Sequence, residues 1–284
     1  MTHTYRLIYD CPDQVGIVTK VGQIITENNG WISQASHYSD EDSKRFFSRL
    51  VVNADSLPFG PEALHNKFMP LAQELQMNLK VVDDAIPKRV ILMASKGSHC
   101  LSDLLDRWRS GDLKCEIPCV ISNHDDMRSL VEYYGIPYHH VAIEKDNKAA
   151  GFEQVERLVD EYKVDSVVLA RYMQIIPQAL CEKYRHQVIN IHHSFLPSFI
   201  GAKPYHQASR RGVKLIGATC HYVTEQLDEG PIIDQDVVRV NHSDTVNDLV
   251  RLGKDVEKSV LARGLRAHLE DRILVHGNKT VVFN

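Results

Sequence analysis

Residues 88–111, KRVILMASKGSHCLSDLLDRWRSG, place a run of apolar side chains, a short polar loop and a helical pattern in immediate succession. The apolar run has the length and composition of a buried β-strand. The same order of strand and helix recurs at short spacing as far as a strand at residues 187–193. This alternation predicts a parallel sheet joined by right-handed crossovers, whose ligands bind beyond the carboxyl ends of the strands. We therefore expect a site where these loops gather: those after Ala94, Asn123, Arg171 and His192.

The rest of the chain extends this unit on both sides. Downstream, residues 215–223 and 231–240 have the pattern of two further strands, and residues 245–272 that of a long helix. Upstream, residues 4–84 predict the order β-α-β-β-α-β, a ferredoxin-like arrangement, with the first helix ending at Asn29 and Gly30. A short polar joint containing Pro87 separates the two patterns. We predict an α/β protein with domains at residues 1–85 and 86–284.

Composition excludes several classes of protein. The 284 residues are 43% hydrophobic and 25% charged, with a net charge of −4, which disfavours nucleic acid as the main partner. No apolar run is long enough to span a membrane, and the first residues predict no secretory signal. The six scattered cysteines are expected to be reduced thiols in a cytoplasmic protein, and no second pair joins Cys115 and Cys119 in a zinc set.

Two adjacent histidines stand in VINIHHSFLPSF, residues 188–199. Side chains alternate between the faces of a strand, so Asn190 and His192 share one face and His193 is expected on the other. A metal held by both histidines is therefore disfavoured. Asn190 and His192 could donate hydrogen bonds to a substrate oxygen, and Asp228, on a glycine-containing turn, could serve as the base. Polar residues in loops are common, so a purely structural role stays open from these residues alone.

Three ordered motifs add a family resemblance. N-I-H-x-S-x-L-P at residues 190–197, G-A-T-x-H-x-V at 217–223 and L-D-E-G-P-I-I at 227–233 resemble the signature of the formyl transferases that use 10-formyltetrahydrofolate. LARYMQII, residues 169–176, is similar to the segment that lines the folate pocket in that family. The resemblance implies a Rossmann-like formyl transferase domain that needs neither metal nor cofactor.

The resemblance also implies roles for particular residues. It carries the catalytic Asn, His and Asp of the family onto Asn190, His192 and Asp228. It predicts that the folate substrate is bound by Met173, Gln174, Ile175, Ile176 and Thr224. Lys203 or Arg171 could face the glutamate tail of the folate.

Within the family, the sequence of the loop after residue 94 indicates which molecule accepts the formyl group. The glycinamide ribonucleotide enzymes have a glycine-rich phosphate cradle there, but this chain has ASKGSHCL, residues 94–101, and keeps one glycine. The chain also lacks the basic extension of the methionyl-tRNA enzymes. S-K-x-x-H-C-L and GAKPYHQA, residues 201–208, resemble the hydrolytic branch, in which water accepts the formyl group and formate is supplied for purine synthesis.

Three alternatives remain open from sequence. The first is a transferase with an amine acceptor such as glycinamide ribonucleotide. The second is a folate-binding sensor without turnover. The third, a dinucleotide-dependent enzyme, is disfavoured because no G-x-G-x-x-G follows any predicted strand.

The first domain resembles an ACT module, a small regulatory fold that binds amino acids. Its D-x-x-G signature spans residues 13–16. The resemblance implies methionine and glycine as effectors and pairing into a homo-oligomer; a role in assembly alone is the alternative. The candidate effector-binding residues are Asp13, Gly16, Asn29 and Gly30.

Overall fold

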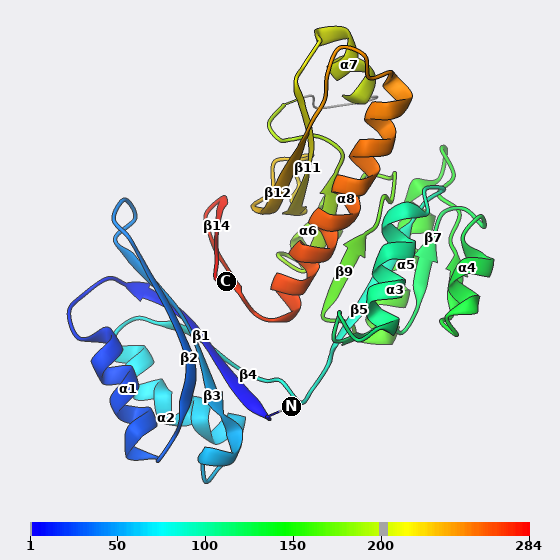
Figure 1. Ribbon diagram of the computed structural model, residues 1–284. Helices are drawn as coiled ribbons and strands as arrows, with labels where there is room; N and C mark the ends of the chain where they lie inside the picture. Colours follow the sequence, from blue (N-terminus) through cyan, green and yellow to red (C-terminus); the bar gives the residue numbers. More distant parts are fainter. Residues whose placement is uncertain (1, 199–203) are drawn as a thin grey trace. The chain divides into compact units, whose positions relative to one another are not determined.

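The computed structural model describes residues 2–198 and 204–284 and divides the chain into two compact units (Figure 1). The first unit comprises the chain up to Pro87 together with Glu270–His276 and Val281–Asn284. The second comprises Lys88–Leu269 and Gly277–Thr280. The division near residue 87 lies close to the expected one, but the last residues differ, since most of those after Leu269 belong to the first unit.

The first unit has the expected β-α-β-β-α-β order. Its elements are β1 (Thr4–Pro12), α1 (Ile17–Glu27), β2 (Ile32–Asp40), β3 (Arg45–Asn53), a short 3-10 helix (Ala54–Ser56), α2 (Pro61–Glu74) and β4 (Asn78–Asp83). The sheet has the order β2-β3-β1-β4, and every neighbouring pair is antiparallel. Alternate β1 residues such as Leu7 and Tyr9 pack in one core with Ile25 of α1 and Phe68 of α2. Helix α2 continues through Pro70, a residue that usually ends or kinks a helix.

Most of a C-terminal hairpin belongs to this unit as well. Strands β13 (Ile273–His276) and β14 (Lys279–Val282) pair with each other, and Leu274 and Phe283 form a small core with Ile8 and Phe47. This hairpin was not predicted from the sequence, although Gly277 and Asn278 between two apolar runs are a recognised hairpin signal. The first domain is therefore built from both ends of the chain.

The second unit contains an eight-stranded sheet with the order β12-β11-β10-β9-β5-β7-β8, and β6 pairs with β5 off this path. All pairs from β10 to β8 are parallel, whereas β10, β11 and β12 pair antiparallel. The strands are β5 (Lys88–Ala94), β6 (Cys115–Glu116), β7 (Val120–Ser122), β8 (Tyr138–His140), β9 (Ser166–Leu169), β10 (Val188–His192), β11 (Leu215–Tyr222) and β12 (Ile232–Arg239). Pro118, which cannot donate a backbone hydrogen bond, lies between the short strands β6 and β7.

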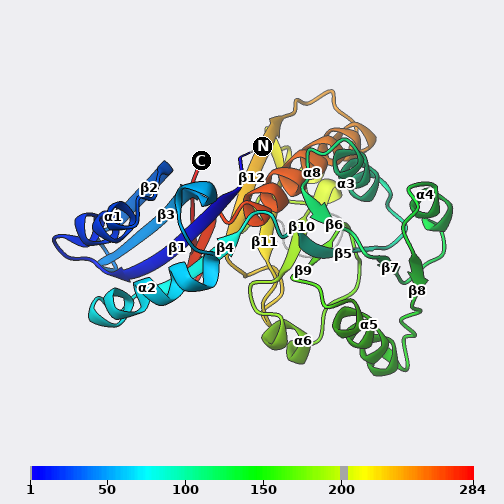
Figure 2. The same ribbon diagram turned by 90° about the horizontal axis from the view of Figure 1, so that it is seen from below.

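Helices cover both faces of this sheet (Figure 2). They are α3 (His99–Arg109), α4 (Arg128–Tyr133), α5 (Lys148–Tyr162), α6 (Gln178–Lys183), α7 (Pro204–Arg211) and α8 (Val246–Leu269). Phe152 and Val155 of α5 pack with Ile91 and Met93, which share one face of β5. Helices α3 and α8 contact each other, and α8 lies along β11. The carboxyl ends of β5, β7, β9 and β10 are thus left free for a site.

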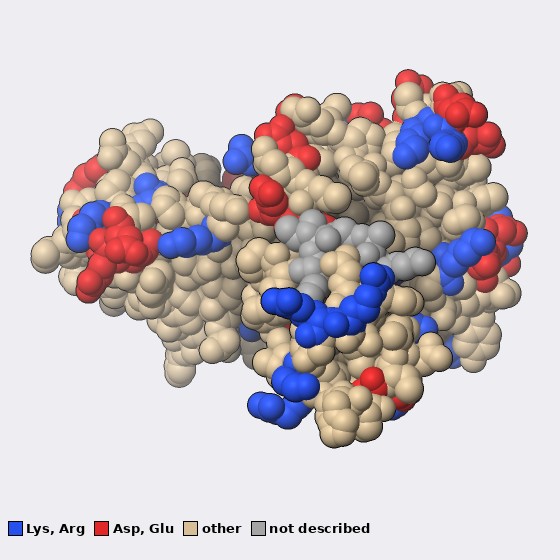
Figure 3. All heavy atoms as spheres, turned by 90° about the horizontal axis from the view of Figure 1, so that it is seen from above, with Lys and Arg blue, Asp and Glu red and all other residues tan. Residues whose placement is uncertain are grey.

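In the view of Figure 3, acidic and basic side chains form separate small patches between larger uncharged areas. Among the residues that the structure describes, no helix combines the length and the apolar character needed to cross a membrane.

Candidate active site

The fold brings Asn190, His192 and Asp228 together. Asn190 and His192 lie on β10, and Asp228 lies on the turn that follows the neighbouring strand β11. His192 donates its Nδ1 proton to Asp228 Oδ2 over 3.1 Å, and the two side chains are only 6% and 9% exposed. The shared face of Asn190 and His192, expected from strand periodicity, is the face that Asp228 reaches.

The turn itself depends on unusual backbone. Asp228 has a φ of 59°, in the left-handed region that Asp tolerates better than most residues. A Cβ at Gly230 would come within 1.8 Å of the carbonyl oxygen of Tyr222, so only glycine fits there. These two positions return the chain sharply enough to bring the carboxylate of Asp228 back beside β10.

His221 is a fourth member of the cluster that the sequence analysis did not single out. It lies opposite Asn190 in the antiparallel pairing of β10 and β11. Its Nδ1 donates to the carbonyl oxygen of Tyr222 at 2.9 Å, so its Nε2 can accept from the amide Nδ2 of Asn190 at 3.3 Å. His221 thereby orients the Asn190 amide. The second amide proton of Asn190 stays available for another acceptor.

Asp228 carries the negative charge of this cluster. Burial by itself would raise the pKa of Asp228, but the hydrogen bond from His192 and the neighbouring imidazoles outweigh burial, so the pKa lies below its ordinary value. Asp228 is therefore a carboxylate at neutral pH. Its Oδ1 lies 3.7 Å from His221 Nε2, too far for a hydrogen bond, and can accept from a bound molecule.

His192 presents its other ring nitrogen to the site. His192 Nε2 is buried and has no hydrogen-bond partner among the described residues. Buried polar atoms are rarely left unpaired, and exceptions are frequent at functional sites. Nε2 is thus the atom of the cluster with the clearest need for a ligand.

A cavity of about 420 Å³ opens beside these groups. Its walls include the catalytic candidates and all described residues that were expected to bind substrate: Met173, Gln174, Ile175, Ile176 and Thr224. Lys203 lies outside the described residues. Met173 and Ile175 are 57% and 66% exposed, which is unusual for large apolar side chains and suits the wall of a ligand pocket.

The segment carrying these residues is anchored from β5 and β7. The backbone N–H of Met173 donates to Ser95 Oγ at 2.9 Å, and Ser95 Oγ donates to Asn123 Oδ1 at 2.6 Å. Ser95 and Asn123 directly follow β5 and β7, so two parallel strands fix the wall of the pocket through one chain of hydrogen bonds.

His193 does not turn away from the site as expected. Strand β10 ends at His192, so the alternation of faces no longer governs the next residue. The imidazole of His193 lies with its centroid 5.2 Å from that of His192 and lines the same cavity. Burial, together with the Arg171 guanidinium, lowers the pKa of His193 to about 3, so its ring is neutral at neutral pH.

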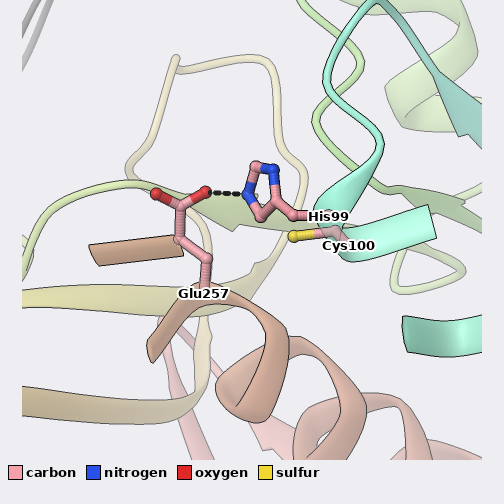
Figure 4. Close-up of side chains that lie close together, drawn as sticks. All are labelled: His99, Cys100 and Glu257. Carbon is pink, nitrogen blue, oxygen red and sulfur yellow. Dashed lines mark hydrogen bonds and ion pairs between the residues drawn. The ribbon is translucent and has the colours of Figure 1, made fainter. Parts of the chain in front are cut away.

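A second polar cluster beside the cavity was also missed. Figure 4 shows Glu257 of α8 reaching His99 at the start of α3, with Cys100 next to it. These three side chains have a spacing that could hold a metal ion. However, Glu257 Oε2 already contacts His99 Nε2 at 2.8 Å and Arg171 Nε at 3.3 Å, and Glu257 Oε1 accepts from Tyr205 at 2.5 Å. The cluster therefore resembles a closed network around a carboxylate.

The candidate effector-binding residues lie in the first unit and do not converge. Asp13 and Gly16 precede α1, whereas Asn29 and Gly30 follow it, so an eleven-residue helix separates the two pairs. Asn29 has a φ of 60°, as expected where a helix ends. A Cβ at Gly30 would come within 2.6 Å of the Ile25 side chain, so this glycine has a packing role.

Comparison with known proteins shows the family to which the chain is similar. A family model described as formyl transferase matches residues 88–265. The formyltetrahydrofolate deformylase of Synechocystis sp. is 48% identical over 281 residues, which cover 99% of this chain and 98% of the relative. That of Bacillus subtilis is 45% identical and covers 98% of this chain and 93% of the relative.

Solved structures give the same result. The crystal structure of a formyltetrahydrofolate deformylase from Pseudomonas syringae pv. tomato matches with a TM-score of 0.99 and 61% identity, covering 100% of this chain and 95% of that one. A glycinamide ribonucleotide transformylase from Symbiobacterium toebii matches with a TM-score of 0.65 and 29% identity, covering 70% of this chain and 95% of its own.

The fold and the Asn–His–Asp site define a protein of the formyl transferase class. Within that class, the similarity extends over both units and not over the second alone. The chain belongs to the formyltetrahydrofolate deformylase family.

The neutral state of His193 predicts how stability depends on pH. The unfolded chain binds a proton at this histidine below pH 6.5, whereas the folded chain does so only near pH 3. Between these values the unfolded state holds more protons, so stability falls as pH falls, by up to about 1.4 kcal/mol for each pH unit. Thermal unfolding of His193→Asn between pH 7 and 5 should show a shallower loss of Tm than wild type. The exposed His206→Asn is the control and should follow wild type; equal slopes in all three proteins would show that His193 is not buried neutral.

Proposed function

We propose that the chain hydrolyses 10-formyltetrahydrofolate to formate and tetrahydrofolate. The observation that carries this proposal is the buried Asp228–His192 pair, with His192 Nε2 unpartnered among the described residues at the wall of a cavity of about 420 Å³. Relatives named formyltetrahydrofolate deformylase, similar over nearly the whole chain, support it. The free Oδ1 of Asp228 supports water as the acceptor because a carboxylate oxygen can hold and deprotonate a small nucleophile.

In the proposed mechanism, Asn190 and His192 stabilise the developing charge. The free amide proton of Asn190 and Nε2–H of a protonated His192 donate to the formyl oxygen as it gains negative charge. Asp228 keeps the hydrogen bond from His192 Nδ1 at Oδ2 and takes one proton from the attacking water at Oδ1. The new C–O bond forms as this proton leaves the water. The C–N bond then breaks as His192 Nε2 gives its proton to the departing nitrogen of tetrahydrofolate, and the proton held by Asp228 restores the pair. The hydroxyl proton of the resulting formic acid leaves to solvent, which gives formate.

The proposed substrate position follows from the same cavity. The segment Met173–Ile176 and Thr224 would hold the pteridine, with backbone groups fixed by Ser95 supplying hydrogen bonds and Met173 and Ile175 supplying apolar contact. These roles need no metal or cofactor. Activity in the cytoplasm, and a contribution to the formate supply for purine synthesis, belong to the same proposal.

We further propose that the first unit is an ACT module that responds to an amino acid, with methionine and glycine as the candidates. Its β-α-β-β-α-β order and the D-x-x-G segment at the entrance to α1 support this. The separation of Asp13 and Gly16 from Asn29 and Gly30 along α1 supports a site completed by a second copy of the chain, in a homo-oligomer, because one copy does not bring both pairs together.

The role of Asp228 is tested by Asp228→Asn. The substitution keeps the shape of the side chain but removes the base, so the rate of formate release should fall at least about a hundredfold while folate still binds. Formate is measured with 10-formyltetrahydrofolate alone, without any amine. Asp236→Asn, an exposed carboxylate on β12, is the control. Full activity of Asp228→Asn would exclude Asp228 as the base, and formyl transfer that requires an added amine would favour a transferase.

The regulatory proposal is tested by adding methionine or glycine to the same assay. Asp13→Ala should shift the effector concentration needed for half of the response severalfold, whereas the exposed Asp42→Ala in the β2–β3 turn should not. A point variant is preferable to deletion of residues 1–85, because deletion would uncover Leu274 and Phe283. The absence of any response in the wild-type protein would contradict the proposal.

A further inference from the structure

Arg171 has an unusual backbone conformation. It follows β9 and has a φ of 64°, in the left-handed region where glycine is the residue without steric cost. A bulky residue in this region has a steric cost, so the contacts of its side chain need to be considered. The side chain of Arg171 is 17% exposed and lines the same cavity as Asn190 and His192.

Glu257 holds Arg171 from behind. The carboxylate of Glu257 is 1% exposed and is fixed by His99 and Tyr205 as well as by Arg171. Burial would raise the pKa of Glu257, but the hydrogen bond from His99 and the charge of Arg171 lower it below its ordinary value, so this group is an anion. Figure 4 shows this carboxylate directed from α8 toward His99. Glu257 is thus a positioning residue for Arg171.

Only one edge of the guanidinium is used by this contact. Arg171 faces Glu257 with Nε, and among the described residues no partner is found for its two Nη groups. A guanidinium with a free edge at the wall of a pocket is suited to bind a carboxylate through two parallel hydrogen bonds. The neutral ring of His193 lies on the same wall and can donate one more.

The reaction creates such a carboxylate. When water attacks the formyl carbon and the C–N bond breaks, the product formate carries a negative charge beside the carboxylate of Asp228. Two like charges in a buried site repel each other, and a cation on the same wall offers the product a more favourable position.

We propose that Arg171, oriented by Glu257, forms a subsite for the product formate and other small carboxylates at the wall of the catalytic cavity. This inference rests on the proposed function. It accounts for a positively charged side chain at a position with left-handed backbone, and for the buried network that holds it.

The test is product inhibition by sodium formate. Hydrolysis of 10-formyltetrahydrofolate is followed by measuring the tetrahydrofolate formed. In Arg171→Gln, the inhibition constant for formate should rise about tenfold or more, as expected for the loss of charge-assisted hydrogen bonds. The KM for the folate substrate should change much less. Arg171→Lys keeps the charge but loses the paired donors, and Glu257→Gln loosens the support, so both should show smaller rises. The exposed Arg185→Gln is the matched control and should resemble wild type.

Several outcomes would overturn the subsite. An unchanged inhibition constant in both Arg171→Gln and Arg171→Lys would do so, as would a wild-type protein that formate does not inhibit. A large rise in KM for folate with an unchanged inhibition constant would instead assign Arg171 to the glutamate tail. If wild type releases no formate from 10-formyltetrahydrofolate, the proposed function fails; if it releases formate and Arg171→Gln responds to formate like wild type, only the subsite fails. Should Arg171→Gln not fold, as judged by its thermal unfolding, Arg171→Lys decides.

Discussion

The hydrogen bond between His192 Nδ1 and Asp228 Oδ2 is the interaction on which the site depends. It fixes the direction of the imidazole, keeps Asp228 ionised although it is largely buried, and leaves His192 Nε2 directed at the molecule that occupies the cavity. Neither residue could serve the proposed chemistry alone. A buried carboxylate without this partner would be protonated more easily, and an imidazole without the carboxylate would lose its orientation.

The fold can be understood as the means of making that contact. The parallel strands β5, β7, β9 and β10 deliver their loops to one edge. Strand β11 runs antiparallel to β10 and ends at Tyr222, opposite Ile189, so the turn after it comes back along β10 to bring Asp228 to His192. Asp228 and Gly230 then permit a turn tight enough to place the carboxylate beside β10. Around the cavity, Ser95 and Glu257 hold the segment from Arg171 to Met173 by a hydrogen bond and an ion pair. The pocket is thus supported from β5 and β7 through Ser95 and Asn123, and from α8 through Glu257.

Much of this arrangement could be predicted from the sequence, and the failures have physical reasons. Strand-like and helical patterns of apolar residues predicted both folding units. The alternation of side chains along a strand predicted that Asn190 and His192 share one face. Alternation failed at His193 because the strand ends one residue earlier. The partnership of His221 with Asn190 depends on strand register, which local patterns do not specify. Glu257 could have been found, since it falls on the buried stripe of α8 with Leu249, Gly253 and Val260. The last residues were assigned to the wrong unit because their packing on Ile8 and Phe47 is a long-range contact.

The central claim is that water, activated by Asp228 beside His192, takes the formyl group. The most direct test is hydrolysis of 10-formyltetrahydrofolate by the purified protein in water enriched in oxygen-18, with the formate analysed by mass spectrometry at early times. The account predicts formate that carries one labelled oxygen, formed without any amine and lost in Asp228→Asn. Unlabelled formate, or formate that appears only after an amine is added, would contradict it.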